Sequence, residues 1–153
     1  MGQDNAIKIM EVFYENPDKQ FTIREISEAA RVPRATAHKI LRELKREGII
    51  SRMNIAENSL IFKTRKINFF TEKTVSSGLV EELIEKLNPS CIILFGSIRK
   101  GDSNKESDID LFVESSVKKE VNLGKYKKKI GHKIQLFIEP NINKLHDNLF
   151  NNV

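Results

Sequence analysis

The chain contains a single cysteine and no long apolar run among its 153 residues. One cysteine cannot form an internal disulfide, and Cys91 lies within an apolar stretch, where a buried thiol is expected rather than a nucleophile or a metal ligand. No stretch approaches the roughly 18 apolar residues that span a membrane, and the polar N-terminus lacks the features of a signal peptide or a myristoylation site. We therefore expect a cytoplasmic protein without membrane segments.

Composition and charge suggest a soluble globular protein of one domain or two small ones. Hydrophobic residues make up 39% of the chain and charged residues 31%. The net charge of +5 is unevenly distributed, because residues 1–66 contain 13 Lys and Arg against 9 Asp and Glu, whereas residues 67–153 contain 13 against 12. The basic excess therefore belongs to the N-terminal part.

Three amphipathic helices are predicted in this N-terminal part. The first ends at Asn16-Pro17, and the second begins at Thr22, which forms a capping box with Glu25. After a tight turn over residues 31–33, the third helix has apolar residues at i, i+3, i+4 and i+7, namely Ala37, Ile40, Leu41 and Leu44. Its opposite face is a basic stripe, which we define as Arg34, His38, Arg42 and Lys45, with Lys39 and Arg46 beside it.

A β-hairpin is predicted to follow the third helix. Gly48 ends that helix, and Ile49-Ile50 would pair with residues 60–63 around a polar loop. Three helices and a hairpin over residues 5–66 resemble a winged helix-turn-helix domain, although Pro33 stands where a capping serine is usual. The resemblance implies that the third helix enters the major groove of duplex DNA while Arg52 and the hairpin contact phosphates. Winged helices also dimerise or dock partners, so a protein contact, including a homodimer, is the alternative.

Residues 67–78 are interpreted as a short linker, anchored to one domain by Phe69-Phe70. An amphipathic helix over 79–87, ended by Asn88-Pro89, then opens the C-terminal domain of residues 79–153. The predicted organisation is a domain over 1–66, a linker over 67–78 and a second domain over 79–153.

A glycine and two aspartates form the most informative pattern of the second domain. The apolar run 91–95 predicts a buried strand that ends at Gly96-Ser97, where a glycine allows a ligand to approach the backbone closely. Asp108 and Asp110 lie on the next predicted strand, 107–113, where alternate side chains share one face. Two adjacent carboxylates repel each other unless a cation lies between them, and their oxygens suit Mg²⁺ bound to a triphosphate.

Gly-Ser, a short spacer and Asp-x-Asp on a strand resemble the signature of the nucleotidyltransferase superfamily related to DNA polymerase beta, in its minimal branch. The resemblance implies that Gly96 and Ser97 hold the terminal phosphates of a nucleoside triphosphate and that Asp108 and Asp110 are the catalytic, metal-binding residues. It also implies a separate helical protein partner. Arg99 in the spacer, with Lys100 and Lys105, could neutralise triphosphate charge, although a solvated basic loop is the alternative.

The chain departs from this family where a third acidic residue is usual. The predicted strand over 133–138 has an apolar face of Ile134, Leu136 and Ile138, and Gln135 stands where the acid would be expected. A neutral amide binds Mg²⁺ far less well than a carboxylate and cannot act as a base. Only another acid, such as Glu139, could complete a two-metal site.

The remaining C-terminal features are less specific. Residues 118–130 are rich in lysine, which favours a solvated helix face over a contact with a nucleic-acid acceptor. His132 and His146 have no partner at metal-ligand spacing and are interpreted as surface residues. A last helix is predicted over 142–152.

The predicted fold is α+β: a winged helix of three helices and a β-hairpin, followed by a small nucleotidyltransferase domain with a mixed sheet flanked by helices. Two functions from different classes remain open. The first is a transferase that moves a nucleoside monophosphate from Mg-nucleoside triphosphate to an acceptor hydroxyl, with a DNA-binding domain attached. The second is a DNA-binding regulator or antitoxin-like module whose nucleotidyltransferase domain is weakly active or only binds nucleotide.

Overall fold

The computed structural model describes residues 2–145. The chain divides into two compact units, Met1–Thr64 and Arg65–Val153. Each unit has its own buried core, and each is described by itself. No helix in the described part of the chain is long and apolar enough to cross a membrane.

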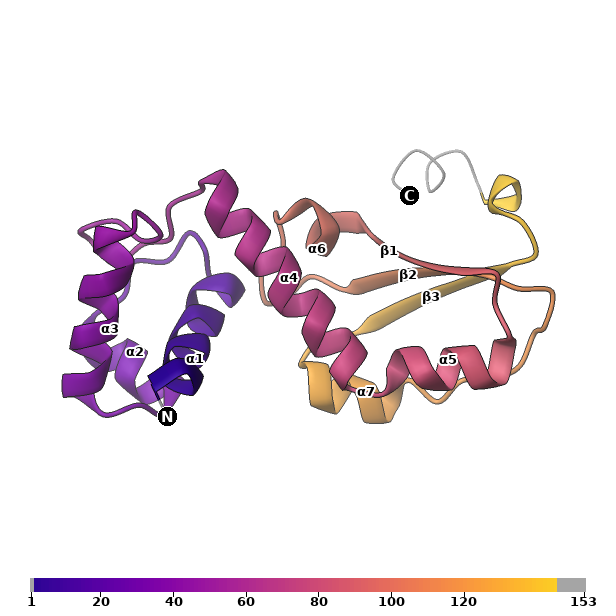
Figure 1. The fold of residues 1–153 in the computed structure, drawn as a ribbon, viewed down its shortest axis with the longest axis horizontal. Coiled ribbons are helices and arrows are strands. Elements are labelled where there is room, and N and C mark those ends of the chain that lie inside the picture. The colour runs from indigo at the N-terminus through magenta and orange to yellow at the C-terminus, as the bar shows by residue number, and fades with distance from the viewer. Residues whose placement is uncertain (1, 146–153) are drawn as a thin grey trace. The chain divides into compact units, whose positions relative to one another are not determined.

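Three helices form the first unit: α1 (Gly2–Glu15), α2 (Ile23–Ala30) and α3 (Arg34–Arg46) (Figure 1). The predicted capping box begins α2, since the Glu25 amide donates to Thr22 Oγ1 at 3.2 Å and the Thr22 amide donates to Glu25 Oε2 at 2.7 Å. All four predicted apolar positions of α3 are buried, and α1 contributes the fully buried Ile9 and Phe13. The three amphipathic helices are therefore confirmed.

The turn between α2 and α3 forms without a side-chain cap. Arg31 adopts a left-handed conformation, with φ of 54°, and Ser27 Oγ donates to the carbonyl of Val32 at 2.7 Å. Pro33 precedes α3 and offers no capping hydrogen bond. Ser27 thus fixes the turn from within α2, and the unusual proline is accommodated at the helix start.

The predicted hairpin is wrong in its second strand. Ile50 pairs with Ala56 in an isolated bridge, so the turn closes around residues 51–55, and residues 60–63 begin helix α4 (Leu60–Ser76) instead. Ser59 explains the difference, because its hydroxyl accepts the amide of Phe62 at 3.2 Å and its carbonyl accepts the amide of Lys63 at 3.0 Å. These bonds satisfy the first turn of a helix rather than a strand ladder.

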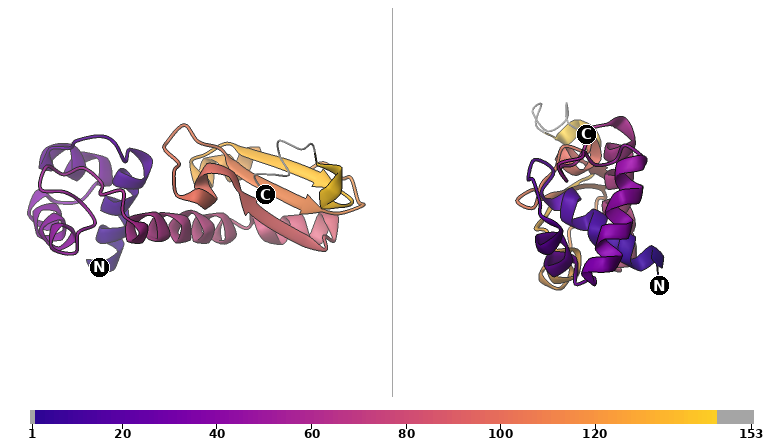
Figure 2. Two further views of the ribbon diagram at one scale, coloured as in Figure 1. Left: turned by 90° about the horizontal axis from the view of Figure 1, so that it is seen from above. Right: turned by 90° about the vertical axis from the view of Figure 1, so that its left-hand side faces the viewer.

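The residues interpreted as a linker are helical. Helix α4 is a single unbroken helix (Figure 2), and its buried positions recur at a helical spacing: Phe62, Lys66, Phe70 and Thr74. The boundary between the two units falls within this helix. Phe70 is 1% exposed and its ring meets that of His132 edge-on at 5.1 Å, which confirms that the phenylalanine pair anchors this segment.

A mixed three-stranded sheet lies at the centre of the second unit. The strands β1 (Cys91–Phe95), β2 (Ile109–Glu114) and β3 (Ile134–Glu139) lie in that order, with β1 antiparallel and β3 parallel to β2. Figure 1 shows α5 (Leu79–Leu87) and α7 (Gly124–Ile130) on one side of these strands. The hydroxyl of Tyr126 in α7 bonds to the Gly78 carbonyl and to Glu82, which ties α7 to α5. The α+β class is confirmed.

The two faces of β2 differ in composition. Ile109, Leu111 and Val113 are buried on one face, as their alternation predicts. On the other face, Phe112 packs in an apolar cluster with Phe95 and Leu145. Phe95, Asp110 and Gln135 form one cross-strand row next to the row that contains Phe112, so polar groups border this apolar cluster directly.

The end of the chain differs from the predicted last helix. Residues Ile142–Lys144 form a short 3-10 helix, and Leu145 leaves it in an extended conformation. The remainder of that predicted helix, with His146, lies outside the described residues.

Candidate functional site

The two aspartates of the sequence pattern meet at one end of the sheet. Asp110 is the second residue of β2, between Phe95 of β1 and Gln135 of β3 in the strand register. Asp108 lies two residues earlier, directly before β2, and both side chains are half-buried. The carboxylates therefore share a face, as the Asp-x-Asp spacing predicts.

Gly96 lies against Asp110, and any other residue would be strained there. It has a φ of +72°, and a Cβ atom added to it would lie 2.0 Å from Asp110 Oδ2. Burial and the neighbouring charge of Asp108 both raise the pKa of Asp110. A cation between the carboxylates would relieve both effects, so the pair is suited to a positively charged ligand.

Ser97 and Arg99 lie on the short helix α6 (Gly96–Lys100), which directly follows β1. The carbonyl of Ser97 accepts the amide of Asp102 at 3.0 Å, which closes the chain into a compact turn beside the carboxylates. Arg99 and Lys100 are exposed, and within residues 2–145 no ion pair joins Arg99 to Asp108 or Asp110. Lys105 approaches Glu106 at 3.9 Å.

Gln135 occupies the position on β3 where a third acid was expected. Its side-chain Nε2 donates to Asp108 Oδ2 at 2.6 Å. Glu139, the alternative acid, lies opposite Glu114 in the strand register, at the other end of β3. Four residues separate it from Gln135, which is about 13 Å along an extended strand. Among the described residues, no three His, Cys, Asp or Glu side chains form a metal-binding group.

Two supporting residues were not recognised in the sequence. His132, interpreted as a surface residue, is 2% exposed, and its Nδ1 lies 2.6 Å from the carbonyl of Ser107, next to Asp108. Because a carbonyl only accepts, Nδ1 must carry the hydrogen. Lys66 is fully buried and donates to the carbonyl of Ser103, in the loop between α6 and β2. The four-residue spacing of Phe62, Lys66 and Phe70 was the signal that could have identified Lys66.

The candidate DNA-binding side chains lie on the outer face of α3. Arg34, His38, Lys39 and Arg42 are exposed, Lys45 is half-buried, and Arg52 is exposed in the turn after α3. The inner face of α3 is buried along its whole length. The basic stripe is therefore a solvent-facing surface of the first unit.

Two family models match the chain, one over each unit. Residues 76–146 match the nucleotidyltransferase domain, and residues 4–53 match the IclR helix-turn-helix domain. The two matches give the predicted order, a helix-turn-helix region followed by a nucleotidyltransferase region. No curated protein and no solved structure matched it in the corresponding searches. The matched nucleotidyltransferase region contains Gly96, Ser97, Asp108, Asp110 and Gln135.

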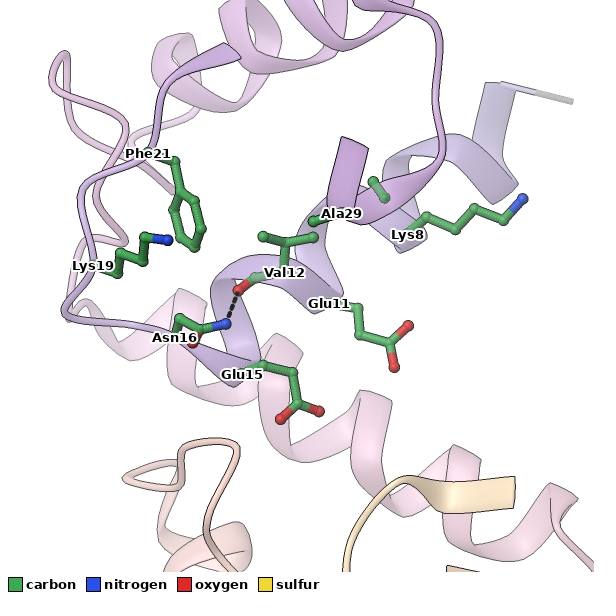
Figure 3. A pocket seen from close by; sticks show the side chains of 9 residues that line it. Lys8, Glu11, Val12, Glu15, Asn16, Lys19, Phe21 and Ala29 are labelled. Atoms are coloured by element: carbon green, nitrogen blue, oxygen red, sulfur yellow. Dashed lines mark hydrogen bonds between the residues drawn. The ribbon is translucent and has the colours of Figure 1, made fainter. Parts of the chain in front are cut away.

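The helix-turn-helix domain contains a separate pocket with a volume of about 420 Å³ (Figure 3). Val12 and Phe21 line it with apolar surface, and the charged residues around it are Lys8, Glu11, Glu15 and Lys19. Asn16 closes one side by donating to the Val12 carbonyl at 3.2 Å. None of the candidate DNA-binding or nucleotide-binding residues lines this pocket.

Two lysines of the lysine-rich helix α7 contact residues of α5 or the turn before it. Lys125 approaches Glu82 at 2.5 Å, and Lys129 donates to the carbonyl of Ser77 at 2.9 Å. Lys127 and Lys128 are exposed. Half of this lysine cluster therefore fastens α7 to the residues that begin α5, which agrees with a structural role for those lysines.

Proposed function

We propose that the chain transfers a nucleoside monophosphate from a Mg-nucleoside triphosphate to an acceptor hydroxyl. The observation that carries this proposal is the close approach of Gly96 to Asp110, which leaves no room for a side chain between the Gly-Ser turn and the carboxylate. Terminal phosphates would lie against the backbone of Gly96 and the hydroxyl of Ser97. Arg99, exposed on the same helix, would approach them from solvent.

One divalent cation fits the donor atoms at this end of the sheet. Asp108 and Asp110 supply the carboxylate oxygens that Mg²⁺ prefers. Burial and, after it, the negative charge of Asp108 raise the pKa of Asp110, and a cation beside it would favour the ionised form. Bound Mg²⁺ would supply positive charge to the triphosphate. The third carboxylate that a second ion requires is missing from the described residues.

The proposed reaction is an in-line displacement at the α-phosphorus. The acceptor oxygen forms a bond to that phosphorus, the bond to the bridging oxygen of the β-phosphate breaks, and pyrophosphate leaves. The hydroxyl proton is released to solvent. Gly96 and Ser97 hold the leaving phosphates in line with the acceptor. The entropy of aligning the reactants is then lost when the nucleotide binds, which lowers the barrier of the transfer step.

The helix-turn-helix domain is proposed to bind duplex DNA through the basic stripe. Arg34, His38, Lys39 and Arg42 present exposed cations or hydrogen-bond donors along the outer face of α3, which is the geometry of a recognition helix in a major groove. Lys45 and Arg52 would contact phosphates at the edge of the interface. Because the predicted hairpin is only a short turn closed by the bridge between Ile50 and Ala56, most of the contact area would come from α3.

A regulator or antitoxin-like module is the second candidate, and Gln135 is the observation that favours it. Loss of one oriented transition-state contact typically costs about 10² to 10³ in rate. A chain with an amide in place of the third acid could therefore bind nucleotide with little transfer. In this candidate the nucleotidyltransferase domain reports nucleotide binding to the DNA-binding domain.

A transfer assay separates the two candidates. The chain is incubated with each of the four triphosphates, labelled on the α-phosphate, together with Mg²⁺ and cell extract. Label that becomes attached to a macromolecule or small molecule, and is lost in Asp110→Asn, supports the transferase. Nucleotide binding without any transferred label supports the regulator, and the absence of both excludes a nucleotide function.

A further inference from the structure

The amide of Gln135 bonds directly to one of the two carboxylates. In the parallel register of β2 and β3, Gln135 lies opposite Asp110, and its Nε2 reaches Asp108 Oδ2 at 2.6 Å. A carboxylate accepts hydrogen bonds, so the NH₂ group of the amide must face Asp108. The side chain at the third-acid position thus turns its neutral donor group to Asp108 and adds no negative charge to the site.

The donor groups of the site suit a single ion. Asp108 and Asp110 supply carboxylate oxygens for one divalent cation, and among the described residues no third His, Cys, Asp or Glu joins them. A second ion would have to be held by a neutral amide whose donor group faces the site. Glu139 cannot substitute, because it lies at the far end of β3 beside Glu114.

We propose that this site takes one divalent cation with its nucleotide, because the Gln135 amide occupies the position of the third acid that a second ion would need. The inference rests on the proposed nucleotide function and specifies the ion requirement of that same site. The hydrogen bond from Gln135 orients Asp108, which with Asp110 would hold the single cation. A carboxylate at position 135 would instead create the donor set for a second ion.

The test counts bound ions rather than turnover. The full chain is titrated with Mn²⁺ in the presence of triphosphates whose α,β-bridging oxygen is replaced by methylene, and free Mn²⁺ is measured by electron paramagnetic resonance. We expect about one bound Mn²⁺ per chain for wild type and about two for Gln135→Glu or Gln135→Asp. Glu139→Gln, which removes a carboxylate from the far end of the same strand, should behave like wild type.

The outcomes are distinguishable. Two ions in the wild-type chain would overturn the single-ion inference and leave the proposed function standing. One ion in both Gln135 variants, with circular dichroism showing them folded, would show that the amide is not what excludes the second ion. Binding of neither Mn²⁺ nor any analogue would overturn the proposed function together with the inference.

Discussion

The backbone of Gly96 lies so close to the side chain of Asp110 that a Cβ atom added to Gly96 would be 2.0 Å from Asp110 Oδ2. The backbone of Gly96 also has a φ of +72°, a region that L side chains rarely adopt. Both constraints favour glycine directly after β1. In the proposed complex, the Gly-Ser turn and the carboxylate would share one phosphate-bound cation.

Gly96→Ala is therefore expected to abolish nucleotide binding and to destabilise the domain. The left-handed backbone alone costs about 1–2 kcal/mol for a residue with a side chain, and displacement of Asp110 adds to this. Thermal unfolding and calorimetric titration with Mg-nucleotide measure the two effects. Gly78→Ala is the matched control, because Gly78 has a φ of +88° but open space around its Cβ position. If both variants bind nucleotide equally well, the contact with Asp110 is irrelevant.

His132 is expected to position Asp108 through the carbonyl of Ser107. His132→Leu removes the Nδ1 donor from the part-buried carbonyl of Ser107, which should cost about 1 kcal/mol of stability. Nucleotide affinity should fall as well. His132→Asn retains a donor near the Nδ1 position and should recover part of both losses. Equal affinity in the Leu variant and wild type would assign His132 a packing role alone.

Asp110→Asn is expected to raise the melting temperature at neutral pH in the absence of metal. The pKa of Asp110 is raised in the folded protein above its usual 3.8, so ionisation disfavours folding. This unfavourable contribution appears as the pH rises above the unfolded pKa and is complete above the folded pKa. The gain from Asn should therefore vanish at a pH below 3.8. Added Mg²⁺ should stabilise wild type but not the variant; an equal response in both would contradict this assignment.

DNA binding by the basic stripe is expected to depend strongly on salt. Affinity for duplex DNA should fall by orders of magnitude between about 50 and 200 mM salt, and Arg34→Glu with Arg42→Glu should abolish binding. The full chain is used, because a cut after residue 66 would divide helix α4. Lys118→Glu with Lys119→Glu changes the net charge equally at exposed positions of the other unit. Equal losses in the two double variants, measured by fluorescence anisotropy, would indicate a non-specific charge effect.

The arrangement of the candidate site was predictable because its signals are local. A buried strand ending in Gly-Ser and an alternating Asp-x-Asp each require only a few neighbouring residues, and the structure brings Gly96 and Asp110 together as this pattern implies. Helix α4 was missed because Leu60–Lys63 contains adjacent apolar residues that suit either a strand or a helix, and the deciding hydrogen bonds come from Ser59. The burial of His132 depends on Phe70, which is distant in sequence. A contact between residues so far apart in the sequence produces no periodic pattern from which burial could be predicted.

The most direct test of the account is a calorimetric titration of the full chain with each nucleoside triphosphate, with and without Mg²⁺. We predict binding of at least one triphosphate that requires Mg²⁺ and is lost in the Asp108→Asn, Asp110→Asn double variant. Circular dichroism would show that this variant keeps its fold. Failure of every triphosphate to bind, or binding unchanged by the double variant, would contradict the assignment of the site.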